Sequence, residues 1–178
     1  MVKPIDTLQI EKKFGKPWKY WMDYMQSINA SELTHTEIAK KVNEKINDSW
    51  WAQTITVAYE QKSGRRKPGQ RADGTYEASV TKSSDEDPAK LAEKWNEFSK
   101  DNKELQSKMK DKPRISKTKK NNLWKAELEN SNKATVAFEK MKNGKTQIAV
   151  MQQKIKTQSD LEKSKKFWQN ILNKFLKK

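Results

Sequence analysis

The sequence predicts an α+β protein in which a three-helix module precedes an antiparallel sheet of about five strands, with a long C-terminal helix packed across the sheet. Three observations lead to this prediction. Apolar residues recur three or four positions apart between residues 17 and 62, which is the spacing of one helix face. After residue 74 they alternate with polar residues, as on half-buried strands. Segment 159–176 is amphipathic again, with apolar residues over about half of its helical circumference.

Three helices are expected in the module of residues 1–63. The first follows Pro17, which suits a first helical turn. Its apolar stripe consists of Trp18, Trp21, Met22, Met25 and Ile28. The second opens at Thr34, with Glu37 three residues later in the pattern of a capping box. The third begins near Asp48 or the residue after it and ends before residue 64.

Residues 64–74 follow the helical module. This segment contains three glycines, one proline and four basic residues, a composition typical of a loop or linker. A second domain is expected over residues 75–178. Its first helix should start at Asp87-Pro88 and continue to about Met109.

The strands of this domain are expected where apolar and polar residues alternate. They are a segment from Tyr76 to Val80, a short one near Ile115, and residues 123–128, 133–141 and 145–155. Asn143-Gly144 separates the last two and predicts a tight hairpin turn, because both residues tolerate a positive φ. Ser159, with Glu162 three residues later, predicts the start of the terminal helix.

Composition excludes several classes of site. The 178 residues include no cysteine, so a disulfide, a thiolate zinc site and a cysteine nucleophile are excluded. The single histidine, His35, cannot build a multi-histidine metal centre, and its place in a first helical turn predicts a solvent-facing or capping-region side chain. The sequence lacks a glycine-rich phosphate loop. We therefore expect a non-enzymatic protein with no cofactor and no metal ion.

The sequence shows neither an apolar run of the ~20 residues that span a bilayer nor the apolar core of a secretory signal. A cytoplasmic protein without a membrane span is therefore expected. The formal net charge is +15, and residues 108–120 carry seven basic side chains against the single acid Asp111. Such a field attracts nucleic acid or anionic lipid, although an excess of lysine also serves solubility alone.

Two known families resemble parts of the chain. The first likeness rests on FGKPWKYWMDYM, LTHTEIAKKV and the run WWAQ-x-x-x-V-x-YE within residues 13–82. This segment is similar to a small helical bacterial domain of unknown function. The second rests on Val136-x-Phe138, on NGKTQI from residue 143, and on KFW from residue 166. These features resemble the closing hairpin and grip helix of the SRPBCC superfamily.

The SRPBCC superfamily has a helix-grip fold and includes polyketide cyclases, START-type lipid carriers and the activator of heat-shock protein 90 ATPase. Residues 75–178 are shorter than its usual domain, so the resemblance implies a shortened version with a reduced pocket. It also implies that an apolar small molecule or a protein partner binds between the sheet and the terminal helix. The side chains expected at that interface are Trp95, Phe98, Trp124, Phe138, Val150, Trp168 and Leu172.

An alternative function is sequence-independent binding of nucleic acid. It would use the lysine-rich surface together with the basic side chains of the 64–74 loop, which are Arg65, Arg66, Lys67 and Arg71. The two helices before this loop, residues 34–46 and 49–61, have some likeness to a helix-turn-helix motif. The second of them is very apolar for a face that reads a DNA groove, which favours core packing. The oligomeric state is not indicated by the sequence.

Overall fold

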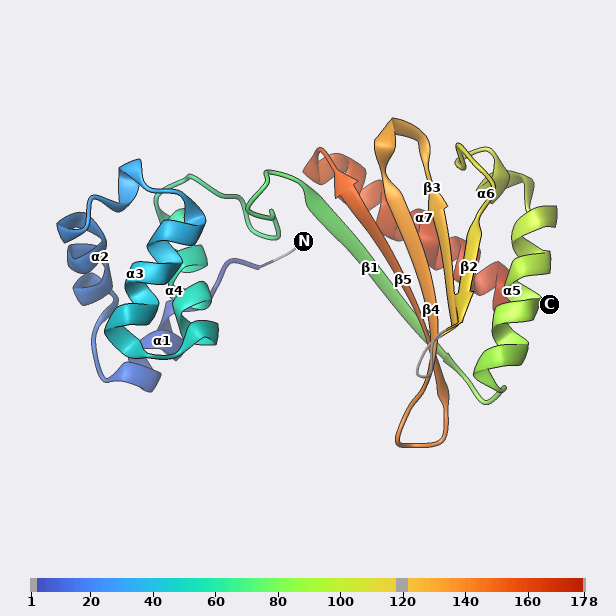
Figure 1. Ribbon diagram of the computed structural model, residues 1–178, viewed down its shortest axis with the longest axis horizontal. Coiled ribbons are helices and arrows are strands. Elements are labelled where there is room, and N and C mark those ends of the chain that lie inside the picture. Colours follow the sequence, from blue (N-terminus) through green and yellow to red (C-terminus); the bar gives the residue numbers. More distant parts are fainter. Residues whose placement is uncertain (1–2, 118–121, 178) are drawn as a thin grey trace. The chain divides into compact units, whose positions relative to one another are not determined.

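The computed structural model describes residues 3–117 and 122–177. Within it the chain divides into two compact units, Met1–Gly74 and Thr75–Lys178 (Figure 1). The first unit is helical, and the second combines a five-stranded antiparallel sheet with helices, including a long C-terminal one. The predicted α+β fold class is therefore confirmed.

The helical unit contains one helix more than the sequence predicts. Its elements are α1 (Thr7–Phe14), α2 (Trp18–Ser27), the 3₁₀ turn η1 (Ala30–Glu32), α3 (His35–Ile46) and α4 (Ser49–Lys62). The additional helix is α1. The Asp6 side chain caps it by accepting a hydrogen bond from the Leu8 N–H, and Gly15 ends it in the left-handed conformation at φ 63°.

The starts of the other helices follow the predicted signals. Thr34 and Glu37 form a complete capping box at the start of α3. The side chain of Asp48 accepts a hydrogen bond from the Trp51 N–H and so begins α4. Pro17 is the residue just before α2 rather than part of its first turn. These caps satisfy backbone donors that have no partner inside the helices.

The core of the helical unit lies between the apolar faces of all four helices. Trp21, Ile38 and Ile55 have at most 1% of their surface exposed. Phe14 connects two helices through edge contacts, with ring centroids 5.2 Å from Trp21 and 5.7 Å from Trp51. Helical periodicity therefore explains which apolar side chains of this unit are buried.

The second unit is a two-layer structure. Its strands are β1 (Tyr76–Ser84), β2 (Arg114–Lys117), β3 (Asn122–Glu127), β4 (Lys133–Lys140) and β5 (Thr146–Ile155), in the spatial order β1-β5-β4-β3-β2. Its helices are α5 (Pro88–Asp101), the short α6 (Lys103–Gln106) and α7 (Gln158–Leu176). Helix α7 packs against β1 and β5, and α5 packs against β3 and β4 (Figure 1). Alternate residues of each central strand are buried beneath these helices.

Several features of this unit differ from the prediction, and β1 continues to Ser84 rather than ending near Val80. Helix α5 ends at Asp101, because the chain turns extended at Asn102, whose side chain then caps α6. In the β4–β5 turn only Gly144 has a positive φ, 81°, and the loop is closed by a hydrogen bond from the Met141 N–H to the Lys145 carbonyl. Helix α7 starts slightly earlier than the Ser159–Glu162 pattern predicts, with Thr157 rather than Ser159 as its N-cap residue.

Candidate functional site

The side chains predicted to bind a ligand lie together in the interior of the second unit. Trp95 and Phe98 come from α5, Trp124, Phe138 and Val150 from the sheet, and Trp168 and Leu172 from α7. None has more than 6% of its surface exposed. They pack directly on one another: the Trp95 ring centroid is 5.8 Å from that of Trp124 and 6.4 Å from that of Phe138. The space between sheet and helices at these positions is thus filled by protein side chains.

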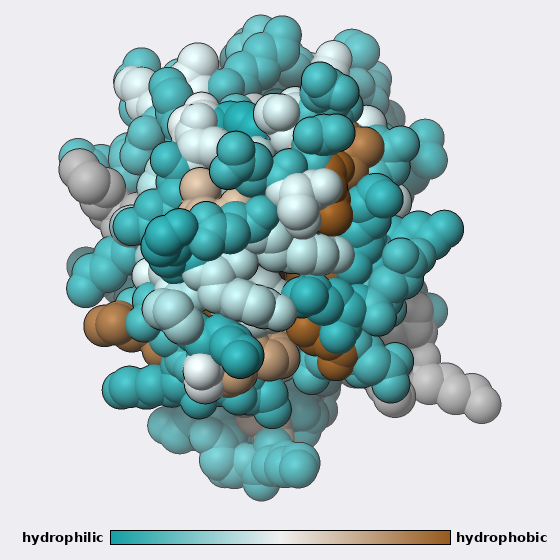
Figure 2. All heavy atoms as spheres, turned by 90° about the vertical axis from the view of Figure 1, so that its left-hand side faces the viewer, coloured by the Kyte–Doolittle hydropathy of each residue, from teal (hydrophilic) through white to brown (hydrophobic). Residues whose placement is uncertain are grey.

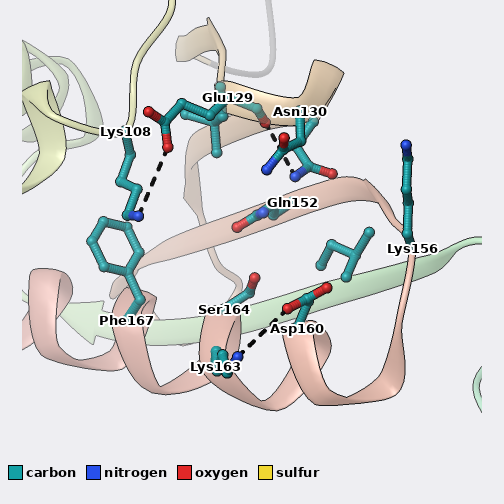
Figure 3. A pocket seen from close by; sticks show the side chains of 12 residues that line it. Lys108, Glu129, Asn130, Gln152, Lys156, Asp160, Lys163, Ser164 and Phe167 are labelled. Atoms are coloured by element: carbon teal, nitrogen blue, oxygen red, sulfur yellow. Dashed lines mark hydrogen bonds and ion pairs between the residues drawn. The ribbon is translucent and has the colours of Figure 1, made fainter.

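Beside this packed core, a pocket of about 310 Å³ opens at the end of the layer where β5 leads into α7 (Figure 3). We call it the α7 pocket. Its lining residues are Lys108, Leu128, Glu129, Asn130, Asn132, Gln152, Ile155, Lys156, Asp160, Lys163, Ser164 and Phe167. Leu128, Ile155 and Phe167 supply its apolar surface. Figure 3 shows Phe167, Ser164 and Asp160 along α7 on one side and Gln152 on its strand opposite them.

A β-bulge in β5 shapes this pocket. Tyr76 of β1 pairs with Ile155, whereas Ala78 pairs with Gln152, so β5 contains one extra residue between the two pairs. Within the bulge, Lys154 adopts the left-handed backbone conformation, with a φ of 65°. Strict alternation would turn Ile155 away from the face that buries Gln152. With the extra residue, both Gln152 and Ile155 are buried on the face that lines the pocket.

The turn between β3 and β4 forms another wall. Asn130 and Ser131 both have φ 59°, and the Leu128 N–H donates to the Asn132 carbonyl 2.8 Å away. Asparagine adopts the left-handed region more readily than most residues, whereas serine there is uncommon. This turn buries the side-chain Oδ1 of Asn132 without a hydrogen-bond partner among the described residues. Burial of an acceptor without a hydrogen bond is costly, so this turn is a strained part of the pocket wall.

Gln152 connects the pocket to the core. Its Oε1 accepts a hydrogen bond of 2.7 Å from the indole Nε1 of Trp168. The amide Nε2 of Gln152 makes no hydrogen bond to any other described residue, so it is a donor available at the pocket surface. The indole N–H groups of Trp95 and Trp124, in contrast, are buried and have no partner in the described part of the chain.

The mouth of the pocket carries charges of both signs. Lys108 Nζ lies 3.9 Å from Glu129 Oε2, and Lys163 Nζ lies 3.8 Å from Asp160 Oδ1. Lys156 is exposed and has no ion-pair partner in the part of the chain that the structure describes. The pocket thus combines an apolar floor, one available amide donor and one unpaired cation. This set is suited to binding a small amphiphile that has an anionic end.

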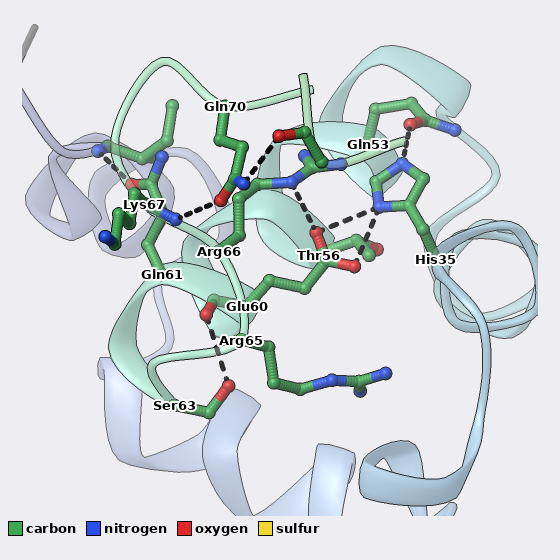
Figure 4. A network of polar contacts seen from close by, with 12 residues as sticks. His35, Gln53, Thr56, Glu60, Gln61, Ser63, Arg65, Arg66, Lys67 and Gln70 are labelled. Carbon is green, nitrogen blue, oxygen red and sulfur yellow. Dashed lines mark hydrogen bonds and ion pairs between the residues drawn. The ribbon is translucent and has the colours of Figure 1, made fainter. Parts of the chain in front are cut away.

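In the helical unit, His35 is the first residue of α3, in the predicted capping region, but its side chain is bound by other residues rather than facing solvent. Its Nδ1 lies 3.1 Å from both carboxylate oxygens of Glu60, and its Nε2 lies 2.7 Å from Gln53 Oε1 (Figure 4). Arg66 approaches Glu60 from the other side, with its Nε 3.1 Å from Oε2. The His35 side chain is 17% exposed, and those of Glu60 and Arg66 are 7% and 9% exposed. We call these four residues the Glu60 network.

The basic loop of the alternative function is partly engaged within the helical unit. Arg65 donates from its guanidinium to the backbone carbonyls of Ala30 and Leu33, at 2.6 and 2.7 Å. Arg66 belongs to the Glu60 network. Lys67 and Arg71 are exposed, and Arg71 also interacts with another residue. Two of the four basic side chains therefore have structural roles, and the function we propose rests on the α7 pocket instead.

Sequence reasoning missed two features. The α7 pocket depends on a bulge centred on a lysine, and the only sequence signal is that Gln152 and Ile155 break the alternation of β5. The Glu60 network joins residues distant in sequence. Its signal is a glutamate within the otherwise apolar face of α4.

On the face shown in Figure 2 the surface is mostly hydrophilic. Hydrophobic residues form only small, separate patches on it. In the described ranges 3–117 and 122–177, no helix combines the length and the apolar character that crossing a membrane requires. Comparisons of the chain with protein-family models, curated proteins and solved structures find no match.

Proposed function

We propose that the unit Thr75–Lys178 is a shortened SRPBCC-type domain and that the protein acts by binding a small ligand, without catalysing a reaction. Two observations support this proposal. A sheet with a long C-terminal helix packed on it is the layout of a helix-grip domain. The α7 pocket lies between that helix and the sheet, which is where the superfamily binds its ligands. The helical unit would correspond to the bacterial domain of unknown function.

The observation that carries the proposal is the bulge at Lys154. It places the apolar side chain of Ile155 next to the polar side chain of Gln152 on one pocket wall. A ligand with an apolar body would contact Ile155 and Phe167, gaining about 25 cal/mol for each Å² of apolar surface removed from water. Its polar end would meet the Gln152 amide and Lys156.

The volume limits the ligand. About 310 Å³ is at the lower end of the range typical of small-molecule sites, which is roughly 300–1,000 Å³. A two-chain phospholipid exceeds it, whereas a single short acyl or aryl group fits. Because Lys156 is the unpaired charge at the mouth, we propose an aryl or acyl anion, such as a medium-chain carboxylate, as the ligand class.

The test uses anilinonaphthalene sulfonate, a fluorescent probe with an apolar aromatic body and an anionic group. Wild-type protein should enhance its fluorescence with about one probe per chain, and decanoate should displace it. Ser164→Trp fills the pocket from α7 and should abolish the enhancement. Gln169→Trp, on the exposed side of the same helix, is the matched control and should bind as wild type. Equal binding by both variants would place the probe elsewhere and refute the proposal.

A second pair of variants tests the polar end. Lys156→Gln should weaken binding of the anionic probe by about twofold to fivefold, the range of a solvent-exposed charge pair. Lys166→Gln, which also removes an exposed cation but does not line the pocket, should leave the affinity unchanged. The same weakening in both variants would show that only the overall charge attracts the probe.

A further inference from the structure

A second concave surface of the unit Thr75–Lys178 has a composition opposite to that of the rest of the protein. We call it the α5 groove. It has a volume of about 610 Å³ and runs between α5 and the last turn of α7. Its apolar residues are Leu91, Phe98, Phe175 and Leu176. The first three are nearly buried, and Leu176 is 37% exposed, so apolar surface is accessible at the end of the groove.

The polar residues of the groove are mainly acidic. Glu86, Glu93, Glu97 and Asp101 line it, against the single cation Lys94. Residues 75–178 hold 25 basic and 14 acidic side chains. Four of those acids therefore gather at one groove in a unit whose net charge is strongly positive. Charges more than about 8 Å away are largely screened at physiological salt, so distant lysines weaken the attraction of these carboxylates for a cation only slightly.

Two of the four carboxylates lack an ion-pair partner. Lys94 pairs with Glu86, and Lys100 Nζ lies 2.8 Å from Glu97 Oε1. Glu93 and Asp101 pair with no other residue that the structure describes. The neighbouring cation Lys174 of α7 is engaged with Glu104 instead. The groove thus has unused negative charge on its α5 side.

The spacing of these acids suggests the shape of the partner. Glu93, Glu97 and Asp101 are four residues apart on one helix, so they form a row along the axis of α5 with a rise of about 6 Å between neighbours. Basic residues four positions apart on a second helix have the same rise. An adjacent apolar stripe on that helix would meet Leu176.

We propose that the α5 groove docks a cationic amphipathic helix of a partner protein. Its lysine or arginine side chains would pair with Glu93 and Asp101, and its apolar stripe would cover Leu176 and the edge of Phe175. The groove and the α7 pocket share no lining residue, so this docking is independent of ligand binding in the pocket.

The probe is a fluorescein-labelled peptide with leucines on one helical face and lysines four residues apart beside them. Wild-type protein should bind it despite its own positive charge, and the affinity should fall as salt rises. The double variant Glu93→Lys, Asp101→Lys should weaken binding by about tenfold or more, because attraction becomes repulsion. A peptide with glutamate in place of lysine should not bind.

The matched control is Asp111→Lys, Glu139→Lys, which changes the net charge equally at exposed positions outside the groove. It should bind the peptide as wild type. Equal weakening in both double variants, or no binding by wild type, would overturn the proposal. Sedimentation equilibrium tests whether a second copy of this chain occupies the groove instead. Self-association that is abolished by Glu93→Lys, Asp101→Lys but not by the control would assign the groove to that second copy. It would refute a separate partner.

Discussion

The two units use buried polar side chains in different ways. The helical unit buries an ionised pair, Glu60 and Arg66, at its interior. The buried polar side chains described in the sheet unit are neutral: Ser99, Thr146 and Gln152. Gln152 accepts a hydrogen bond from Trp168 of α7, and the hydroxyl of Thr146 donates to the backbone carbonyl of Glu86 in the turn between β1 and α5.

The two units therefore differ in where their charged side chains have a structural role. In the helical unit, arginines that the sequence offers for binding nucleic acid hold the module together. In the sheet unit the interior is neutral and charges lie at the surface, where they surround the α7 pocket and the α5 groove. Removing a buried side chain such as Trp168 should therefore act through lost packing, whereas removing Glu60 should leave an uncompensated charge.

The largest effect is expected in the neutral interior. Trp168→Ala should lower the free energy of unfolding of the sheet unit by about 3–5 kcal/mol, because a fully buried indole leaves a cavity and Gln152 loses its donor. Hydrogen exchange of the β5 amides measures this loss without contribution from the helical unit. Trp50→Ala, at a 65% exposed position, is the control and should change stability by less than about 0.5 kcal/mol. An unchanged exchange rate in Trp168→Ala would contradict the described core.

The next effect tests the charged interior. Glu60→Gln should destabilise the helical unit by about 2–3 kcal/mol, because Arg66 keeps its charge in a 9% exposed position without its counter-ion. Glu44→Gln, at an exposed position of α3, should have little effect. Adding Arg66→Met to Glu60→Gln should recover most of the loss, since an apolar replacement of a buried pair is often neutral. Failure of the double variant to recover would show that Arg66 stabilises the loop independently of Glu60.

A smaller effect, of opposite sign, concerns the bulge. Lys154→Gly should stabilise the sheet unit by about 0.5–1 kcal/mol, because the left-handed conformation at φ 65° is strained for lysine and free for glycine. Lys156→Gly, at a position without a positive φ, should instead destabilise it slightly. Thermal unfolding of the two variants compares them directly. Destabilisation by both would argue against the bulge.

The smallest effect is a pH dependence in the helical unit. Hydrogen bonds from the backbone N–H and then the hydroxyl of Thr34 hold the pKa of Glu37 below its ordinary value of 4.5. Because the folded pKa is the lower one, the stabilisation is complete above about pH 4.5 and is lost as the pH falls through the folded value. The difference in stability between wild type and Glu37→Gln should therefore be present at pH 7 and shrink in acid. A difference that is constant across this range would contradict the capping role.

The sequence predicts the elements of the fold because their signals are local. The capping box at Thr34 and the cap at Asp48 each lie within a few residues of the helix that they start. Helix α1 was missed because its apolar face is short, and Gly15 and Pro17 suggest a loop. The β4–β5 hairpin was predicted, although its turn uses a positive φ at Gly144 only.

The candidate sites are less predictable because they depend on pairings between distant residues. The seven predicted side chains do meet between sheet and helices, since the alternation of the strands determines which of them face inward. The α7 pocket arises where that alternation is broken at Lys154, and a lysine gives no sign of a left-handed conformation. The Glu60 network requires the packing of α3 on α4 and the return of the 64–74 loop, and neither is encoded in a short motif.

The position of β1 in the sheet has a consequence for how the chain folds. Strand β1 is the first of the sheet to be synthesised, yet among the described strands it pairs only with β5, the last one. On that side β4 also pairs with β5. In the helical unit, in contrast, the most extensive helix contact joins α3 and α4, which follow one another in the chain. Contacts between residues distant in sequence form slowly. On the ribosome we therefore expect the helical unit to fold first and β1 to stay unpaired until β5 emerges, which makes this interval the one most exposed to aggregation.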